Sequence, residues 1–87
     1  MQYVYIPKWM QLLADLAIKD RWISGSNQEI MHPVIFYNIA PKLYKMKLLR
    51  VRTLKHDKRI KEYSLDIEGW LYGNILRKLQ NKVTEDA

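Results

Sequence analysis

The chain of 87 residues contains no cysteine, and its three glycines lie far apart. These absences exclude disulfides, thiolate nucleophiles, cysteine-based zinc sites and a glycine-rich phosphate-binding loop. The longest stretch without a charged side chain, residues 30–41, is too short to span a bilayer, and no secretory leader pattern precedes it. We therefore expect a soluble protein of the cytoplasm, or of the host cytoplasm if the chain is viral, without membrane contact.

Catalytic patterns are also missing. The only two histidines, His32 and His56, are far apart in the chain and have no group of carboxylates in metal-ligand spacing around them. The sequence contains neither a Ser-His-Asp constellation nor paired catalytic carboxylates. We predict no enzymatic activity, no metal site and no cofactor, and we identify no small-molecule ligand.

The positive charge is concentrated in one part of the chain. The formal net charge is +6 and the pI is about 9.7, yet residues 42–61 hold nine Lys or Arg against the single acid Asp57. The segment thus carries about +8 and the remainder about −2. A local basic patch favours a polyanionic partner, because neutralising phosphates releases condensed counterions. The plain alternative is a solvated basic surface.

The length fits one domain over residues 1–87, with no repeat or linker to divide it. Apolar spacings of three and four predict a first helix over 5–22, with Pro7 in its first turn. Ser26 followed by Glu29 has the spacing of a capping box, which predicts a short second helix over 26–32 that His32-Pro33 ends.

A third helix is predicted over 34–47, burying Phe36, Ile39, Ala40, Leu43 and Met46. Pro41 lies inside it, so we expect a kink or a new helix start there. A β-hairpin with a polar tip should occupy 48–65, and a long helix 66–83 should follow the N-cap Asp66. The expected fold class is α+β: three helices, a two-stranded hairpin and a long C-terminal helix.

From residue 35 to 76 the chain resembles winged helix-turn-helix proteins of the MarR/PadR kind. Their Leu-Tyr-x-x-Leu-x-x-Leu recognition helix is matched by FYNIAPKL at 36–43, and their Asp-x-Arg wing motif by DKR at 57–59. Their Leu-Thr-x-x-Gly helix start is matched by LDIEG at 65–69. Short winged-helix proteins of archaeal viruses are similar in length and in the Phe-Tyr-Asn/Asp start of their recognition helix, which is FYN at 36–38 here.

The chain departs from that pattern at three places. Lys47 stands where the family has glycine, which predicts a turn that avoids the positive φ of glycine. Pro41 is unusual in a recognition helix, and the segment between Glu29 and Phe36 is short.

The resemblance implies that the third helix enters the major groove of DNA and that the wing contacts the minor groove. The base-facing candidates are Tyr37, Asn38, Lys42 and Lys45, for which simple solvent exposure is the alternative. At the wing tip, Asp57 would orient Arg59 toward the minor groove, although an acid there can also be a turn former. The expected phosphate contacts are Lys55, Lys58 and Lys61, with His56 as a polar loop residue or a further phosphate contact.

Family members join two subunits through the first and last helices. The resemblance therefore implies six interface residues here: Trp9, Leu13, Trp70, Leu71, Ile75 and Leu79. The sequence therefore predicts a homodimeric, sequence-specific regulator of transcription that binds double-stranded DNA. The alternatives are a winged-helix protein-interaction module and a non-specific architectural or replication protein.

Overall fold

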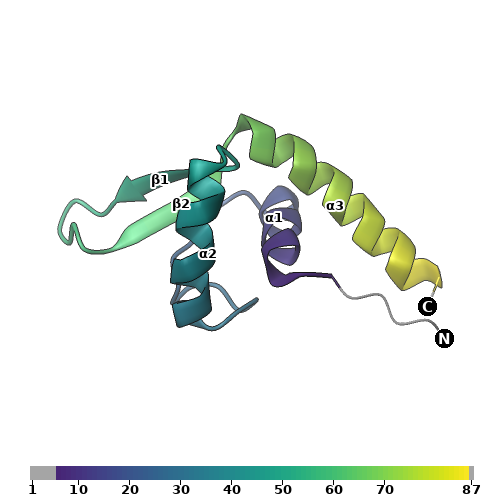
Figure 1. The fold of residues 1–87 in the computed structure, drawn as a ribbon, viewed down its shortest axis with the longest axis horizontal. Coiled ribbons are helices and arrows are strands. Elements are labelled where there is room, and N and C mark those ends of the chain that lie inside the picture. The colour runs from purple at the N-terminus through teal and green to yellow at the C-terminus, as the bar shows by residue number, and fades with distance from the viewer. Residues whose placement is uncertain (1–5, 87) are drawn as a thin grey trace.

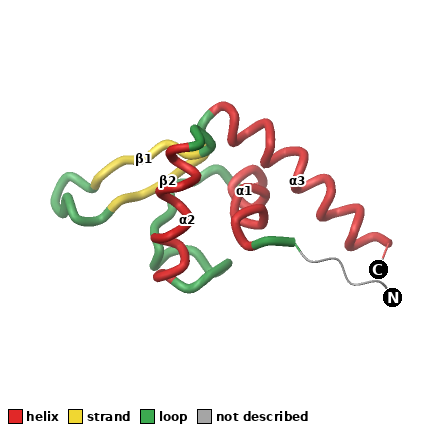
Figure 2. The backbone as a smooth tube through the Cα atoms, in the orientation of Figure 1, coloured by secondary structure: helices red, strands yellow, loops and turns green. Residues whose placement is uncertain are grey.

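The computed structural model describes residues 6–86 and has the predicted α+β composition (Figure 1; Figure 2). In chain order its elements are α1 (Lys8–Ile18), α2 (Pro33–Lys45), β1 (Leu49–Thr53), β2 (Lys61–Leu65) and α3 (Ile67–Asp86). Helix α1 lies between α2 and α3, while the hairpin of β1 and β2 projects beyond α2 at the other end of the molecule from α3 (Figure 1). The hairpin and the C-terminal half of α3 are thus free of one another.

The hydrophobic core forms where α1 meets α2, the base of the hairpin and α3. Leu12, Leu13 and Leu16 of α1 are fully buried there, and Phe36 of α2 is buried with them. Trp9, Trp70 and Leu76 pack on this cluster from its edge. Burying a side chain of this size is worth about 1.5–3 kcal/mol, so these leucines of α1 contribute strongly to the stability of the core.

Helix α1 is shorter than the predicted 5–22, and Tyr5 lies outside the described residues. The chain leaves the helix at Lys19 in an extended conformation. It then reaches the hairpin, where Ile23 and Tyr63 exchange backbone hydrogen bonds of 2.8 and 2.7 Å. These bonds satisfy the Ile23 backbone at the edge of β2, which explains why the helix does not continue to residue 22.

The prediction of a helix over 26–32 is wrong, because turns and bends occupy this segment. The buried side chain of Gln28 takes the place of helical hydrogen bonds. Its Nε2 donates to the carbonyl oxygens of Gly25 (3.1 Å) and Met31 (2.7 Å), and its Oε1 accepts from the backbone amides of Ile30 (3.0 Å) and Met31 (3.1 Å). The loop thus satisfies its polar groups through one side chain rather than through an α-helix.

Helix α2 begins one residue earlier than predicted and ends two residues earlier. Pro33 occupies its first turn, where a missing N–H costs nothing, and the Nδ1 of the N-cap residue His32 accepts from the amide of Val34 at 3.2 Å. The helix runs through Pro41, so the expected new start does not occur. Met46 was predicted to be buried, but it follows the helix as its C-cap and is 60% exposed.

The turn after α2 corrects the expectation for Lys47, whose φ of 65° is the positive value that glycine usually supplies. The amide of Leu48 donates to the carbonyl of Leu43, and the amide of Lys47 donates to that of Tyr44, both at 3.0 Å. This pair of bonds is a Schellman motif, and the buried side chains of Leu43 and Leu48 complete it. The motif forces the left-handed conformation on a lysine.

The hairpin was predicted over 48–65, and its strands pair antiparallel with Leu49 opposite Leu65, Val51 opposite Tyr63 and Thr53 opposite Lys61. Phe36 of α2 contacts Tyr63 edge-on, with 5.8 Å between ring centroids. Because side chains alternate along a strand, α2 covers the face that carries Val51 and Tyr63, and Arg52 points to the opposite face. The hairpin is therefore a wing with two chemically different faces.

Helix α3 starts after Asp66, whose Oδ1 accepts from the amide of Ile67 at 2.8 Å, and it continues three residues past the predicted end. A Cβ on Gly69 would overlap the carbonyl oxygen of Leu48, and one on Gly73 would lie 2.7 Å from that of Leu13. The two glycines let α3 approach the backbone of its neighbours. This close packing compensates for their low helix propensity.

Candidate nucleic-acid interface

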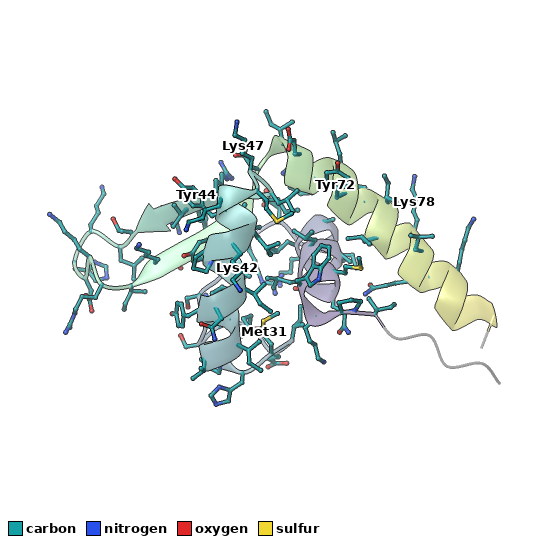
Figure 3. All side chains as sticks on the ribbon, in the orientation of Figure 1. Met31, Lys42, Tyr44, Lys47, Tyr72 and Lys78 are labelled. Carbon is teal, nitrogen blue, oxygen red and sulfur yellow. The ribbon has the colours of Figure 1, made fainter. Side chains whose placement is uncertain are left out.

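Helix α2 presents one continuous face away from the core. The buried residues on its inner side are Phe36, Ala40 and Leu43. Spacings of four, three and four residues place a second row on the opposite side: Val34, Asn38, Pro41 and Lys45. Lys42 lies beside this row and projects from the helix in Figure 3.

Three of the predicted base-facing residues, Asn38, Lys42 and Lys45, are exposed on this face. Among the described residues, no ion pair engages either lysine. The face therefore offers an amide and two ammonium groups. These groups donate the hydrogen bonds that base edges and phosphates accept.

Tyr37 lies on the flank of α2 rather than in the outward row. Its hydroxyl accepts a 3.3 Å hydrogen bond from the amide of Gly25, and its ring meets Phe36 edge-on at 5.3 Å. A Cβ on Gly25 would lie 2.6 Å from the Tyr37 ring. The tyrosine thus holds the loop before α2, although 46% of its surface remains exposed.

Tyr63 lies beneath this flank on β2. Burial raises the pKa of its hydroxyl above the usual value of 10.0, and the neighbouring Tyr37 and Tyr44 raise that pKa further. The Tyr63 side chain therefore stays neutral at physiological pH and belongs to the core beneath α2.

The tip of the wing is ordered by Asp57. Its Oδ1 accepts from the backbone amide of Arg59 at 3.1 Å and from the guanidinium Nε at 3.2 Å, while the Arg59 side chain is 91% exposed. Asp57 and Arg59 are therefore in direct contact. Four further predicted residues surround them with exposed side chains: Lys55, His56, Lys58 and Lys61. The tip thus presents several cations beyond its one carboxylate.

The opposite face of the wing holds a cluster that the sequence analysis missed. The guanidinium carbons of Arg50 and Arg52 lie 4.8 and 4.3 Å from the centroid of the Trp22 ring. Arg52 also pairs with Glu62 at 3.0 Å, whereas Arg50 forms no ion pair among the described residues. The two arginines are next-but-one neighbours, but only the extended path to Ile23 brings Trp22 beside them, so local spacing gave no signal.

The predicted dimer residues separate into three groups. Leu13 is fully buried within its own chain, so its assignment to a subunit interface is wrong. Trp9 and Trp70 are partly buried against the core. On α3, three predicted residues are exposed in a row with spacings of four: Leu71, Ile75 and Leu79, at 63%, 56% and 52%. Ile67 extends this row, which we call the α3 stripe, at 78% exposure.

An apolar cleft of about 310 Å³ lies between α1, the end of α2 and the start of α3. Trp9, Leu48, Tyr72 and Ile75 are among its lining residues, and Glu68 is its one carboxylate. Over residues 6–86, no group of three or more His, Asp or Glu side chains could hold a metal ion. No helix in this part of the chain is long and apolar enough to cross a membrane.

Two solved structures share this arrangement. The heme sensor protein PefR, crystallised with heme and carbon monoxide, superposes with a TM-score of 0.71 at 18% identity, covering 88% of this chain and 56% of its own. Apo Lactococcus lactis ZitR, a double mutant, gives 0.72 at 15% identity, covering 91% and 61%. The present chain therefore spans about three-fifths of the length of these proteins.

No protein-family model matches the sequence, and no curated protein does. The structural likeness shows that the chain has the α+β winged helix-turn-helix fold. Within that fold the hairpin is the wing, and the loop held by Gln28 replaces the short helix that the sequence predicted before α2.

Proposed function

We propose that this protein binds double-stranded DNA through α2 and the wing and acts as a small dimeric regulator of transcription. The observation that carries the proposal is the position of its unpaired cations. Lys45 lies in the outward row of α2 and Lys42 beside it, both exposed and without an ion pair among the described residues, and the same segment of chain continues into the basic wing. Phosphate contacts need clustered cations of this kind.

The wing supplies the second contact. Asp57 restrains the Arg59 side chain while leaving it almost wholly exposed, so its guanidinium is ready to enter a narrow minor groove. Asn38 would pair with an adenine edge in the adjacent major groove. Lys55, Lys58 and Lys61 would hold phosphates and set the register of the protein on the duplex.

The α3 stripe supports dimerisation. Four large apolar side chains on one helix face, each at least half exposed, form a patch that a second copy can bury. A two-fold dimer would place two recognition helices on an inverted repeat whose half-sites lie about 34–36 Å apart. The partly buried Trp9 and Trp70 would then support the interface from within each subunit rather than form its centre.

A salt titration of binding to random-sequence duplex DNA, beside a selection from a randomised duplex pool, tests the proposal. We expect a steep salt dependence and an enriched palindrome. Arg59→Ala should lower the slope of log K against log salt by about one, and Asn38→Ala should cost about 1–3 kcal/mol at one base step. Lys78→Ala is the matched control, because it removes an exposed charge from α3, away from α2 and the wing (Figure 3).

Other outcomes would favour the alternatives. Steep salt dependence without an enriched sequence indicates an architectural protein. Failure to bind duplex DNA at low salt indicates a protein-interaction module, and one observation favours that second candidate. Trp22, Arg50 and Arg52 combine an aromatic ring with arginines on the wing face turned away from α2, and such side chains are enriched at protein interfaces.

A further inference from the structure

Val34 is an exposed apolar side chain at the N-terminal end of the proposed recognition surface. It occupies the second position of α2, and its amide is bonded to His32, so the backbone holds the side chain at the start of the helix. Although Val34 belongs to the same helix as the buried Phe36, it is 64% exposed. A lone exposed valine is ordinary on a protein surface, but this one continues the row of Asn38 and Lys45.

Helix geometry fixes the separation of Val34 and Asn38. They are one turn apart, which is about 6 Å along the axis at 1.5 Å per residue. Base pairs in a duplex follow one another at about 3.4 Å. If α2 lies along the major groove, the two side chains therefore face base pairs one or two steps apart.

The chemistry of the groove then selects their partners. Asparagine pairs bidentately with the N6 and N7 positions of adenine. The valine side chain can neither donate nor accept a hydrogen bond, so it would contact an apolar group. In the major groove that group is the methyl group of thymine. Pro41, next in the row, also lacks a donor, so this part of the helix has few means of recognising a G·C pair.

We infer that Val34 is a specificity-determining residue that contacts the methyl group of a thymine one or two base pairs from the adenine bound by Asn38. This inference rests on the proposed function, since it names the bases read by the same surface. It goes beyond charge, because Val34 adds nothing to phosphate binding. The predicted half-site contains an A·T pair for each of these two residues.

Replacing thymine by deoxyuridine removes only the methyl group, and it therefore provides the test. Each thymine of the selected half-site is replaced in turn, and binding is measured by fluorescence anisotropy. For the unaltered protein, one replacement should weaken binding about fourfold, which corresponds to about 0.8 kcal/mol for one buried methyl group. The Val34→Ser variant should bind the duplex with thymine at that site and the duplex with deoxyuridine there with equal affinity.

Ile18→Ser is the matched control. Ile18 ends α1 and is 65% exposed, nearly the same as Val34, but it lies outside the recognition surface. This variant should keep the fourfold discrimination. Circular dichroism and the salt slope should be unchanged in both variants, because both positions are exposed and neither is charged.

Two results would overturn the inference. One is a thymine effect of equal size in the unaltered protein and in Val34→Ser. The other is sequence-selective or non-selective DNA binding without sensitivity to any thymine methyl group. Loss of all salt-dependent duplex binding is a different result, because it refutes the proposed function itself.

Discussion

Substituting glycine for Lys47 should stabilise the protein. Lys47 is held at a φ of 65°, and a non-glycine residue in this left-handed region costs about 1–2 kcal/mol. Glycine avoids that cost, but its greater conformational freedom in the unfolded chain lowers the free energy of unfolding by about 0.5–1 kcal/mol. The expected net gain is about 0.5–1 kcal/mol, equivalent to a rise in Tm of about 2–8 °C for a domain of this size.

Urea unfolding followed by circular dichroism measures this change directly. Lys47→Ala is the control, because it removes the same charge and keeps the Cβ; its stability should stay within about 0.5 kcal/mol of the unaltered protein. Lys47→Val should be less stable than either, since a branched side chain fits this conformation poorly. A glycine variant no more stable than the alanine variant would refute the assignment of strain to this turn.

Four further predictions concern the loop, the helix crossing, the core and the dimer. Gln28→Ala removes four hydrogen bonds and should cost about 2–4 kcal/mol of unfolding free energy, whereas the exposed Glu29→Ala should change it little. Gly73→Ala should lower the thermal midpoint despite better helix propensity, because its Cβ would crowd the Leu13 carbonyl at 2.7 Å; a higher midpoint would contradict that close approach. The raised pKa of Tyr63 means that the unfolded chain loses this proton first, so stability should fall as pH rises above about 10 and Tyr63→Phe should flatten the fall in urea titrations between roughly pH 9 and 11. Leu71→Glu should convert the proposed dimer to a folded monomer in sedimentation velocity, and an unchanged sedimentation coefficient would exclude the α3 stripe as the interface.

Local sequence pattern determined most of the secondary structure. The three-and-four spacing of α1, the alternation in the wing and the Asp66 cap of α3 each depend on neighbouring residues, so the sequence alone predicts where these elements lie. The exposure of Asn38, Lys42 and Lys45 follows from the same helical period. The geometry of Asp57 and Arg59 at the wing tip is also local, since a turn of three residues contains it.

Tertiary contacts decided the remaining features. The segment 26–32 has a helix-capping pattern, but Gln28 satisfies four backbone groups of the loop and removes the advantage of forming a helix. Leu13 lies on an apolar face of α1 whether that face meets a second subunit or its own chain. Only the close crossing of α3 at Gly73 shows that the chain itself already covers this face. Trp22 meets Arg50 and Arg52 only because Ile23 pairs with Tyr63, forty residues further along the chain.

The sequence by itself thus determined the order of α1, α2, the wing and α3, and the concentration of charge between residues 42 and 61. It could not determine which side chains of an apolar face stay exposed, nor the positive φ at Lys47. Periodicity describes one element at a time, whereas burial and strained backbone depend on the partner that packs against it. Only the tertiary structure shows that the α3 stripe is left uncovered.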